Sequence, residues 1–105
     1  MFYICEAFPV SPLPVPEERI RDEIHPLHVQ FVAAGVAAGT VVFGGPKPGG
    51  GGVILVKAPS MDSCRAFLDG DPMVKAGAQS FRITEFQIFE HAPCLDPILG
   101  HENGQ

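Results

Sequence analysis

The sequence predicts an α+β fold that forms one domain of 105 residues. Four short apolar segments have the composition of β-strands, and two longer segments repeat apolar residues at helical spacing. The hydrophobic content of 46% is ordinary for a globular protein, whereas charged residues reach only 18%. Because so few charges are available for the surface, we expect another subunit to cover part of it.

Charge and composition argue against several classes of partner. The net charge of −5 and the lack of any lysine or arginine cluster disfavour nucleic acids and anionic membranes. No apolar run reaches the roughly 18 residues of a membrane span, and no basic segment precedes an apolar one at the N-terminus. We therefore expect a cytoplasmic protein. Its three widely spaced cysteines are then buried thiols rather than a metal or redox site (Cys5, Cys64 and Cys94).

The first predicted elements are a strand at residues 2–8 and a helix that begins at Pro16. The strand is apolar on both faces, which is typical of a strand covered on both sides. A proline-rich segment predicts an extended linker to the helix (Pro9, Pro12, Pro14 and Pro16). The helix has one apolar stripe at spacings of four, three and four residues (Ile20, Ile24, Leu27 and Phe31). Pro26 should kink or restart the helix, and Gly35 or Gly39 should end it.

Two short apolar segments, residues 40–43 and 53–56, predict a pair of strands. The glycine-rich run Gly44–Gly52 between them predicts a hairpin with a long loop. Such a run also raises the possibility of a phosphate-binding loop. However, it lacks the GK[ST] signature and leads into a strand instead of a helix, so phosphate binding is disfavoured.

A second helix is predicted between Ser60, a favourable N-cap, and Gly70. Four apolar residues form its inner face (Met61, Cys64, Phe67 and Leu68). Asp71 and Pro72 then suit the N-cap and first position of a further short turn, which stops near Gly77.

The last strand is predicted at residues 81–90. Its apolar positions change from odd to even numbers, so either a bulge lies near Glu85 or the second half is buried on both faces. Residues 91–105 contain two prolines and two glycines. They predict an irregular C-terminal arm after a domain of residues 1–90.

The predicted order β-α-β-β-α-β is that of the ferredoxin-like fold, a four-stranded antiparallel sheet with both helices on one face. Two helices cover only one face, yet three of the four strands are apolar on both. An apolar face of that size is rarely left exposed. We therefore expect a dimeric α/β barrel, in which a homodimer or higher oligomer forms through the open sheet face.

His28 is the histidine best placed for chemistry on the predicted helix. At about 100° per residue, it lies about 70° from the centre of the apolar stripe, while His25 lies about 130° away, toward solvent. His28 should therefore face a cleft at the sheet edge. A histidine satisfied by a backbone carbonyl explains the pattern about equally well, and Asp71 alone is explained as a helix cap. One carboxylate can cap a helix and also face a histidine.

Other kinds of site have weaker support in the sequence. His25 and His28 lack the i, i+4 spacing of helical zinc ligands, and only Asp22 is near as a third ligand. Cys64 falls on an apolar helix face, which disfavours a nucleophile. No serine has a base at recognisable spacing. We therefore expect no metal and no cofactor.

Several motifs in sequence order resemble the YCII-related domain. They are the His-Pro-Leu-His run that ends at His28, Ala34-Gly35, Gly45-Pro46, the strand Val53–Val56, Asp71-Pro72-Met-Val-Lys-Ala-Gly77 and Ile83-Thr-Glu-Phe86. The resemblance spans roughly residues 1–90 and implies a ferredoxin-like fold, barrel-type dimers and a His–Asp pair in a cleft. Carried over, the pair is His28 and Asp71, and Gly45-Pro46 forms one wall. The family motif has arginine where this chain has His25, which favours a neutral or phenolic substrate.

The resemblance extends to an enzymatic branch that removes chloride from chlorinated hydroxyhydroquinones, and muconolactone isomerases share the barrel fold. It therefore implies an enzyme in which His28 transfers a proton and Asp71 orients its ring, in an elimination or isomerisation of a hydroxylated aromatic-degradation intermediate. Expected substrate contacts are His25, Tyr3, Phe43, Gly45, Pro46 and Pro72, with Phe8 and Phe86 completing an apolar wall. The alternative is a non-catalytic module that binds a small molecule or serves as an accessory subunit.

Overall fold

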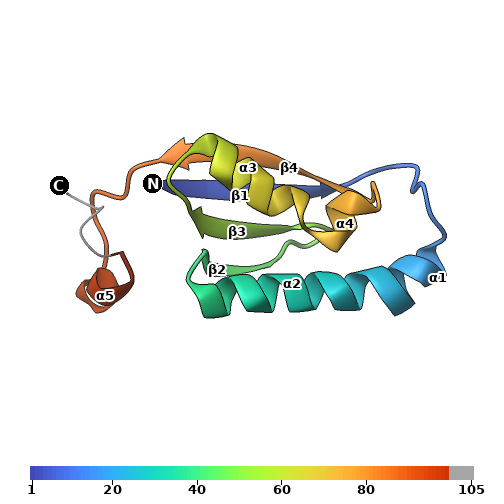
Figure 1. The fold of residues 1–105 in the computed structure, drawn as a ribbon, viewed down its shortest axis with the longest axis horizontal. Helices are drawn as coiled ribbons and strands as arrows, with labels where there is room; N and C mark the ends of the chain where they lie inside the picture. Colours follow the sequence, from blue (N-terminus) through green and yellow to red (C-terminus); the bar gives the residue numbers. More distant parts are fainter. Residues whose placement is uncertain (100–105) are drawn as a thin grey trace.

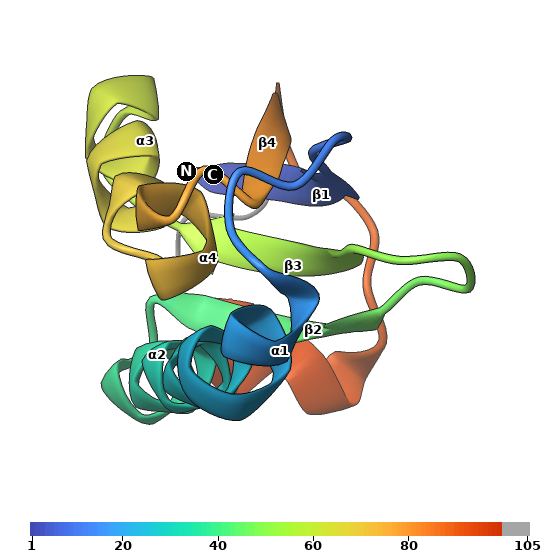
Figure 2. The ribbon, with the colours of Figure 1, turned by 90° about the vertical axis from the view of Figure 1, so that its right-hand side faces the viewer.

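A computed structural model describes residues 1–99 and has a four-stranded sheet with its long helices against one face (Figures 1 and 2). The strands are β1 (Phe2–Pro9), β2 (Val41–Pro46), β3 (Gly52–Lys57) and β4 (Gln79–Phe86). The helices are α1 (Glu17–Arg19), the π-helical turn η1 (Ile20–Ile24), α2 (His25–Ala38), α3 (Met61–Asp69) and α4 (Pro72–Lys75). A 3₁₀ turn η2 (Pro93–Leu95) and α5 (Asp96–Leu99) follow. The rest of the predicted arm, residues 100–105, lies outside the described residues.

The strands lie in the order β2-β3-β1-β4, and every neighbouring pair is antiparallel. This order confirms the predicted ferredoxin-like arrangement, in which the first and third strands are central. The predicted hairpin of β2 and β3 is also present, with Val53 opposite Gly45 and Gly52 opposite Pro46. The sheet thus places the glycine-rich loop at the same end as the start of β4.

The last strand begins two residues earlier and ends four residues earlier than predicted. It pairs with β1 from Gln79 opposite Pro9 to Phe86 opposite Phe2, with no bulge along this register. Phe81 packs in the core under the helices, whereas Phe86 packs in a second core on the other face. The change of apolar phase therefore reflects burial on two faces in turn, and both explanations offered from the sequence were wrong. The register shift of this sheet lies instead between Val41 and Phe43 in β2.

The first helix is continuous from α1 to α2 in Figure 1, and its irregular turn lies just before Pro26. The N–H of His25 bonds to the carbonyl of Ile20, five residues back, which is the π-helical pattern. Pro26 has no N–H to continue the ladder, so α2 restarts there. The helix ends at Gly39, whose φ of 81° suits glycine.

The buried face of α2 differs from the predicted stripe. Leu27 is 51% exposed, whereas Ile24 is buried. Gly35 is also buried, because α2 approaches β2 and α3 so closely that a Cβ on Gly35 would meet Val41 and Phe67 at 2.8 and 3.0 Å. The inward face therefore follows Ile24, His28 and Gly35, and His28 lies near its centre instead of on its flank.

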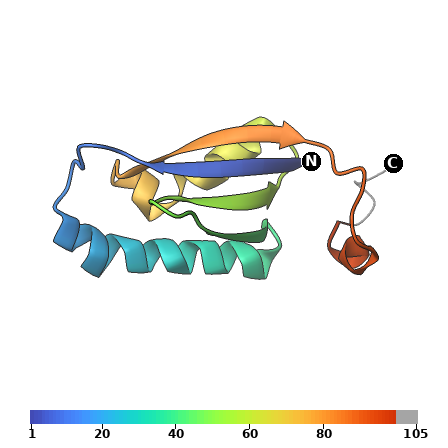
Figure 3. The same cartoon turned by 180° about the vertical axis from the view of Figure 1, so that it is seen from behind.

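Two cores cover the two sides of the sheet. The larger core lies between the sheet and the helices and contains Tyr3, Cys5, Val41, Ile54, Val56, Ala58, Cys64 and Leu68. The smaller core, Phe2, Leu55 and Leu99, lies on the opposite face, where the C-terminal segment packs against one end of the sheet (Figure 3). We call the rest of this opposite face the open face; on it Ile4, Phe8 and Phe43 remain 40, 40 and 59% exposed. Among residues 1–99, no helix is long and apolar enough to cross a membrane.

Candidate active site

His28 and Asp71 come from two different helices and meet at the end of the sheet. The Nδ1 atom of His28 lies 2.9 Å from Oδ1 and 2.8 Å from Oδ2 of Asp71. Asp71 is 1% exposed, while the His28 side chain keeps 23% of its surface exposed. The pair therefore has a buried carboxylate behind an imidazole that reaches solvent.

Asp71 also caps α4, as its position before Pro72 predicted. Its Oδ1 accepts a hydrogen bond from the N–H of Met73 at 2.9 Å. Both roles coexist because a carboxylate accepts several hydrogen bonds. Holding the carboxylate in the cap fixes it against His28. An ionised carboxylate only accepts, so the Nδ1–H donates to Asp71, and in the neutral form of the ring Nε2 carries the free lone pair. No hydrogen bond from residues 1–99 occupies that Nε2 atom.

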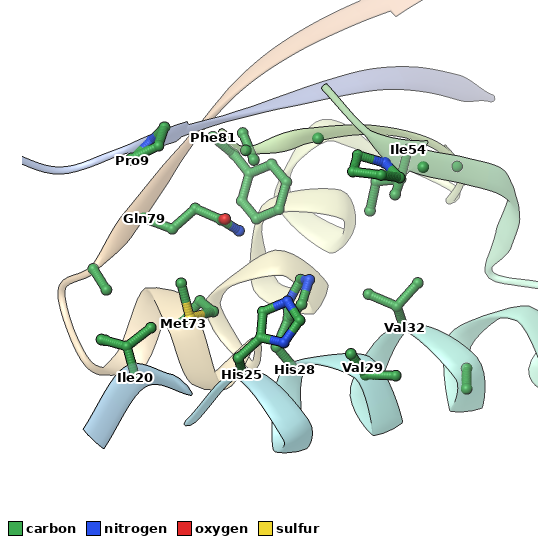
Figure 4. Close-up of a pocket in the computed structure, with 18 of the residues that line it drawn as sticks. Pro9, Ile20, His25, His28, Val29, Val32, Ile54, Met73, Gln79 and Phe81 are labelled. Atoms are coloured by element: carbon green, nitrogen blue, oxygen red, sulfur yellow. The ribbon is translucent and has the colours of Figure 1, made fainter. Parts of the chain in front are cut away.

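A pocket of about 720 Å³ opens beside the histidine, between α2 and the strands (Figure 4). Its walls are mostly apolar and are formed by Ala7, Pro9, Leu13, Ile20, His25, His28, Val29, Val32, Ala33, Gly44, Gly45, Pro46, Gly51, Gly52, Ile54, Met73, Ala78, Gln79 and Phe81. This lining set contains no lysine, arginine, aspartate or glutamate. Its size and apolar walls suit a small aromatic molecule.

His25 lies at the pocket with its ring tilted toward that of His28. The two ring centroids are 5.6 Å apart, and Figure 4 shows both side chains beneath Gln79 and Phe81. His25 is exposed, as predicted, but it also lines the pocket. It therefore has access to both solvent and a bound molecule.

The glycine-rich loop forms one wall of the pocket through its backbone. Gly51 has a φ of 74°, and a Cβ there would lie 2.0 Å from the carbonyl oxygen of Ala7. Only glycine allows so close an approach. Gly45 and Pro46 lie in the same wall, where the resemblance placed them.

Three of the expected substrate contacts are not brought to the pocket. Tyr3 is 0% exposed in the core under the helices, and its hydroxyl reaches the sulfur of Met1, so it offers no hydroxyl to a ligand. Phe43 lies on the open face, because the register shift in β2 turns it away from the helices. Pro72 begins α4 outside the pocket lining. Phe8 and Phe86 also lie outside it.

Gln79 is a pocket residue that the sequence interpretation missed. It is 8% exposed, and its amide nitrogen Nε2 is buried with no hydrogen-bond partner among residues 1–99. Gln79 is an odd-numbered residue of the strand, like Phe81 and Ile83, which face the helices. A polar residue at such a position could have indicated a pocket residue, but the strand was predicted to begin only at Phe81.

The other candidate chemistries gain no support from the geometry. Within the described part of the chain, no three His, Cys, Asp or Glu side chains are grouped to hold a metal ion. Cys5 and Cys64 are buried with their sulfurs 3.7 Å apart. Burial raises the pKa of both thiols, and the neighbouring Cys64 raises that of Cys5 further. Neither thiol is therefore an activated nucleophile.

The fold and the site together define a ferredoxin-like α+β protein with a His–Asp pair at an apolar pocket. A model of the YCII-related domain family matches residues 1–87, so the chain belongs to this family. No curated protein matches the chain.

One solved structure with the same fold is 5-chloro-2-hydroxyhydroquinone dehydrochlorinase (TftG) from Burkholderia phenoliruptrix AC1100, in complex with 2,5-dihydroxybenzoquinone. Its sequence identity is 18%, its TM-score is 0.67, and the match covers 83% of this chain and 94% of that one. At this identity, the likeness is one of fold.

Proposed function

We propose that the protein is an enzyme in which His28 transfers protons and Asp71 orients its ring, without a metal. The observation that carries this proposal is the Nδ1 atom of His28, held 2.8 Å from a carboxylate that is 1% exposed, at the wall of the pocket. A neutral imidazole oriented in this way presents Nε2 as a base near pH 7, and the carboxylate stabilises the imidazolium that forms.

The reaction that fits this arrangement is the elimination or isomerisation of a hydroxylated aromatic-degradation intermediate. In an elimination, a proton passes from the substrate to Nε2 of His28, the electron pair that it leaves behind forms a new double bond in the product, and chloride leaves with the electrons of the carbon–chlorine bond. In an isomerisation, the imidazolium returns the proton to another substrate atom. The apolar pocket supports a small ring as substrate, and the dehydrochlorinase of similar fold is named for a chlorinated hydroxyhydroquinone. Fold likeness alone does not assign the reaction.

The first prediction tests the pair by turnover. The purified protein is incubated with 5-chloro-2-hydroxyhydroquinone, other chlorinated hydroquinones and lactones, while chloride release and quinone absorbance are followed. For a substrate that is turned over, His28→Ala should lower kcat about 10²- to 10⁴-fold, because the proton acceptor is lost. Asp71→Asn should also lower kcat, because an amide neither fixes the tautomer nor stabilises the imidazolium.

The chain offers a matched control in a second His–Asp pair outside the pocket. Nε2 of His91 contacts Oδ1 of Asp96 in the C-terminal segment. His91→Ala should leave kcat unchanged. If His28→Ala turns over every processed substrate at the wild-type rate, the catalytic proposal is wrong. Ligand binding that His28→Ala weakens, with no turnover of any substrate by the wild-type protein, would instead support a binding module.

A further inference from the structure

The unpartnered amide of Gln79 lies across the pocket from the two histidines. Gln79 is the first residue of β4, whereas His25 and His28 belong to α2. Figure 4 shows the Gln79 amide pointing toward the histidine side chains. The pocket therefore has a hydrogen-bond donor on one wall and a hydrogen-bond acceptor, Nε2 of His28, on the other.

A buried donor without a partner is costly to the folded protein. More than nine-tenths of the Gln79 surface is buried, and Nε2 finds no acceptor among residues 1–99. Buried polar groups are normally hydrogen-bonded, so each exception requires an explanation. An acceptor atom supplied by a bound ligand would satisfy this nitrogen once the side chain turns far enough to expose it to the pocket.

The charge of the pocket restricts what that ligand can be. The described lining residues include no lysine or arginine, and the buried carboxylate of Asp71 lies directly behind His28. While His25 and His28 are neutral, a ligand carboxylate would lose its hydration there without gaining a cationic partner, which is unfavourable. The ligand that fits carries uncharged oxygen atoms.

We propose that Gln79 is a specificity-determining residue, whose Nε2 donates a hydrogen bond to one oxygen of an uncharged ring while a second oxygen faces His28. This inference rests on the proposed function in taking the pocket as the substrate site. Its test, however, measures binding and not turnover, so the two proposals can fail separately.

The second prediction is tested by calorimetric titration with two rings of similar shape, hydroquinone and 4-methylphenol. The second ring replaces one hydroxyl by a methyl group. The wild-type protein should bind hydroquinone about 10- to 100-fold more tightly, because 4-methylphenol leaves one polar group of the pocket unpaired. Gln79→Met keeps the length of the side chain but removes the donor, and it should abolish this preference. 4-Hydroxybenzoate should bind the wild-type protein more weakly than hydroquinone.

Stability without ligand separates ligand recognition from a structural role. Gln79→Met removes a buried donor that has no partner, so the Tm of the ligand-free protein should rise by about 4–8 °C. The matched control is Gln30→Met on the exposed surface of α2, which should change neither Tm nor the preference between the rings.

Two results would overturn the inference. One is a Gln79→Met variant that still prefers hydroquinone. The other is a Gln79→Met variant whose Tm is lowered and whose affinity falls by the same factor for both rings. Gln79 would then stabilise the fold and not recognise the ligand. Equal affinity for 4-hydroxybenzoate would overturn the restriction to uncharged rings. If the preference depends on Gln79 but His28→Ala retains full turnover, the inference stands and the catalytic proposal falls.

Discussion

Asp71 connects the stability of the protein with the chemistry of its pocket. Its carboxylate accepts the N–H of Met73 and that of His28, so one buried group begins α4 and orients the imidazole. Gln79 differs from Asp71 in this respect, because the buried amide nitrogen of Gln79 has no hydrogen-bond partner among residues 1–99. At the scale of single residues, the site thus combines a fully used acceptor with an unused donor.

The third prediction concerns the cysteines, of which Cys94 is exposed and not buried as the sequence predicted. Burial raises the pKa of Cys5 and Cys64, so at pH 8 both hold far less thiolate than an ordinary cysteine, whereas Cys94 is exposed. With Ellman's reagent at pH 8, the native protein should show one fast thiol per chain and the unfolded protein three. Cys94→Ser should remove the fast reaction. Rapid labelling of two further thiols in the native state would contradict the buried pair.

At the scale of elements, the close approach of α2 to the sheet positions His28. Gly35 permits this approach, and the rings of Phe31 and Phe67 stack at 4.8 Å beside it. The carbonyl of Ile20 and the N–H of His25 form the turn from which α2 restarts. The π-helical turn before α2 and the close contact at Gly35 therefore together orient α2 so that His28 faces Asp71.

The fourth prediction is that Gly35→Ala destabilises the protein, although the same change stabilises most helices. The added methyl would lie 2.8 Å from a side-chain carbon of Val41, which is 2% exposed and has no room to move. We expect a loss of about 1–3 kcal/mol in the free energy of unfolding, measured by urea denaturation. Val36→Ala, on the exposed side of the same helix, is the control and should change little. A gain of about 1 kcal/mol for Gly35→Ala, as in an open helix, would refute the tight contact.

The order of the elements and the cap at Asp71 could be read from the sequence, because they depend on local signals: alternation, turn residues and capping chemistry. The burial of Tyr3 could not, since β1 is apolar on both faces and alternation does not reveal which face the helices cover. Leu27 was assigned to the buried stripe because Gly35 has no side chain to mark the true inward face. The partner of a buried residue such as Gln79 depends on contacts between distant segments, which no local pattern contains.

At the scale of the whole molecule, the two faces of the sheet are covered unequally. The helices cover one face, and the C-terminal segment covers one end of the other by burying Leu99 against Phe2 and Leu55. Ile4 and Phe43 lie on either side of Leu55, which pairs with both but is itself buried in the smaller core. The exposed apolar side chains of the open face, Ile4, Phe8 and Phe43, are typical of an interaction surface. We therefore propose that a second copy of the chain covers these three residues.

The fifth prediction follows from this proposal. Sedimentation equilibrium should give the mass of a dimer or higher oligomer, and Ile4→Glu should weaken association at least about tenfold by placing a charge in the contact. Leu27→Glu is the matched control, because Leu27 is 51% exposed on α2, away from the open face. A monomer at every concentration tested would refute pairing through the open face.

The double role of Asp71 has a consequence for any family member whose pocket is no longer selected to bind a ligand. Selection for a folded chain alone preserves the carboxylate that caps α4, and with it the hydrogen bond to the histidine. Gln79 contributes no such bond to folding, so drift should replace it by an apolar residue once no ligand is selected for. If both proposals hold, a buried glutamine at this position would mark a family member that still binds its ligand better than the His–Asp pair does.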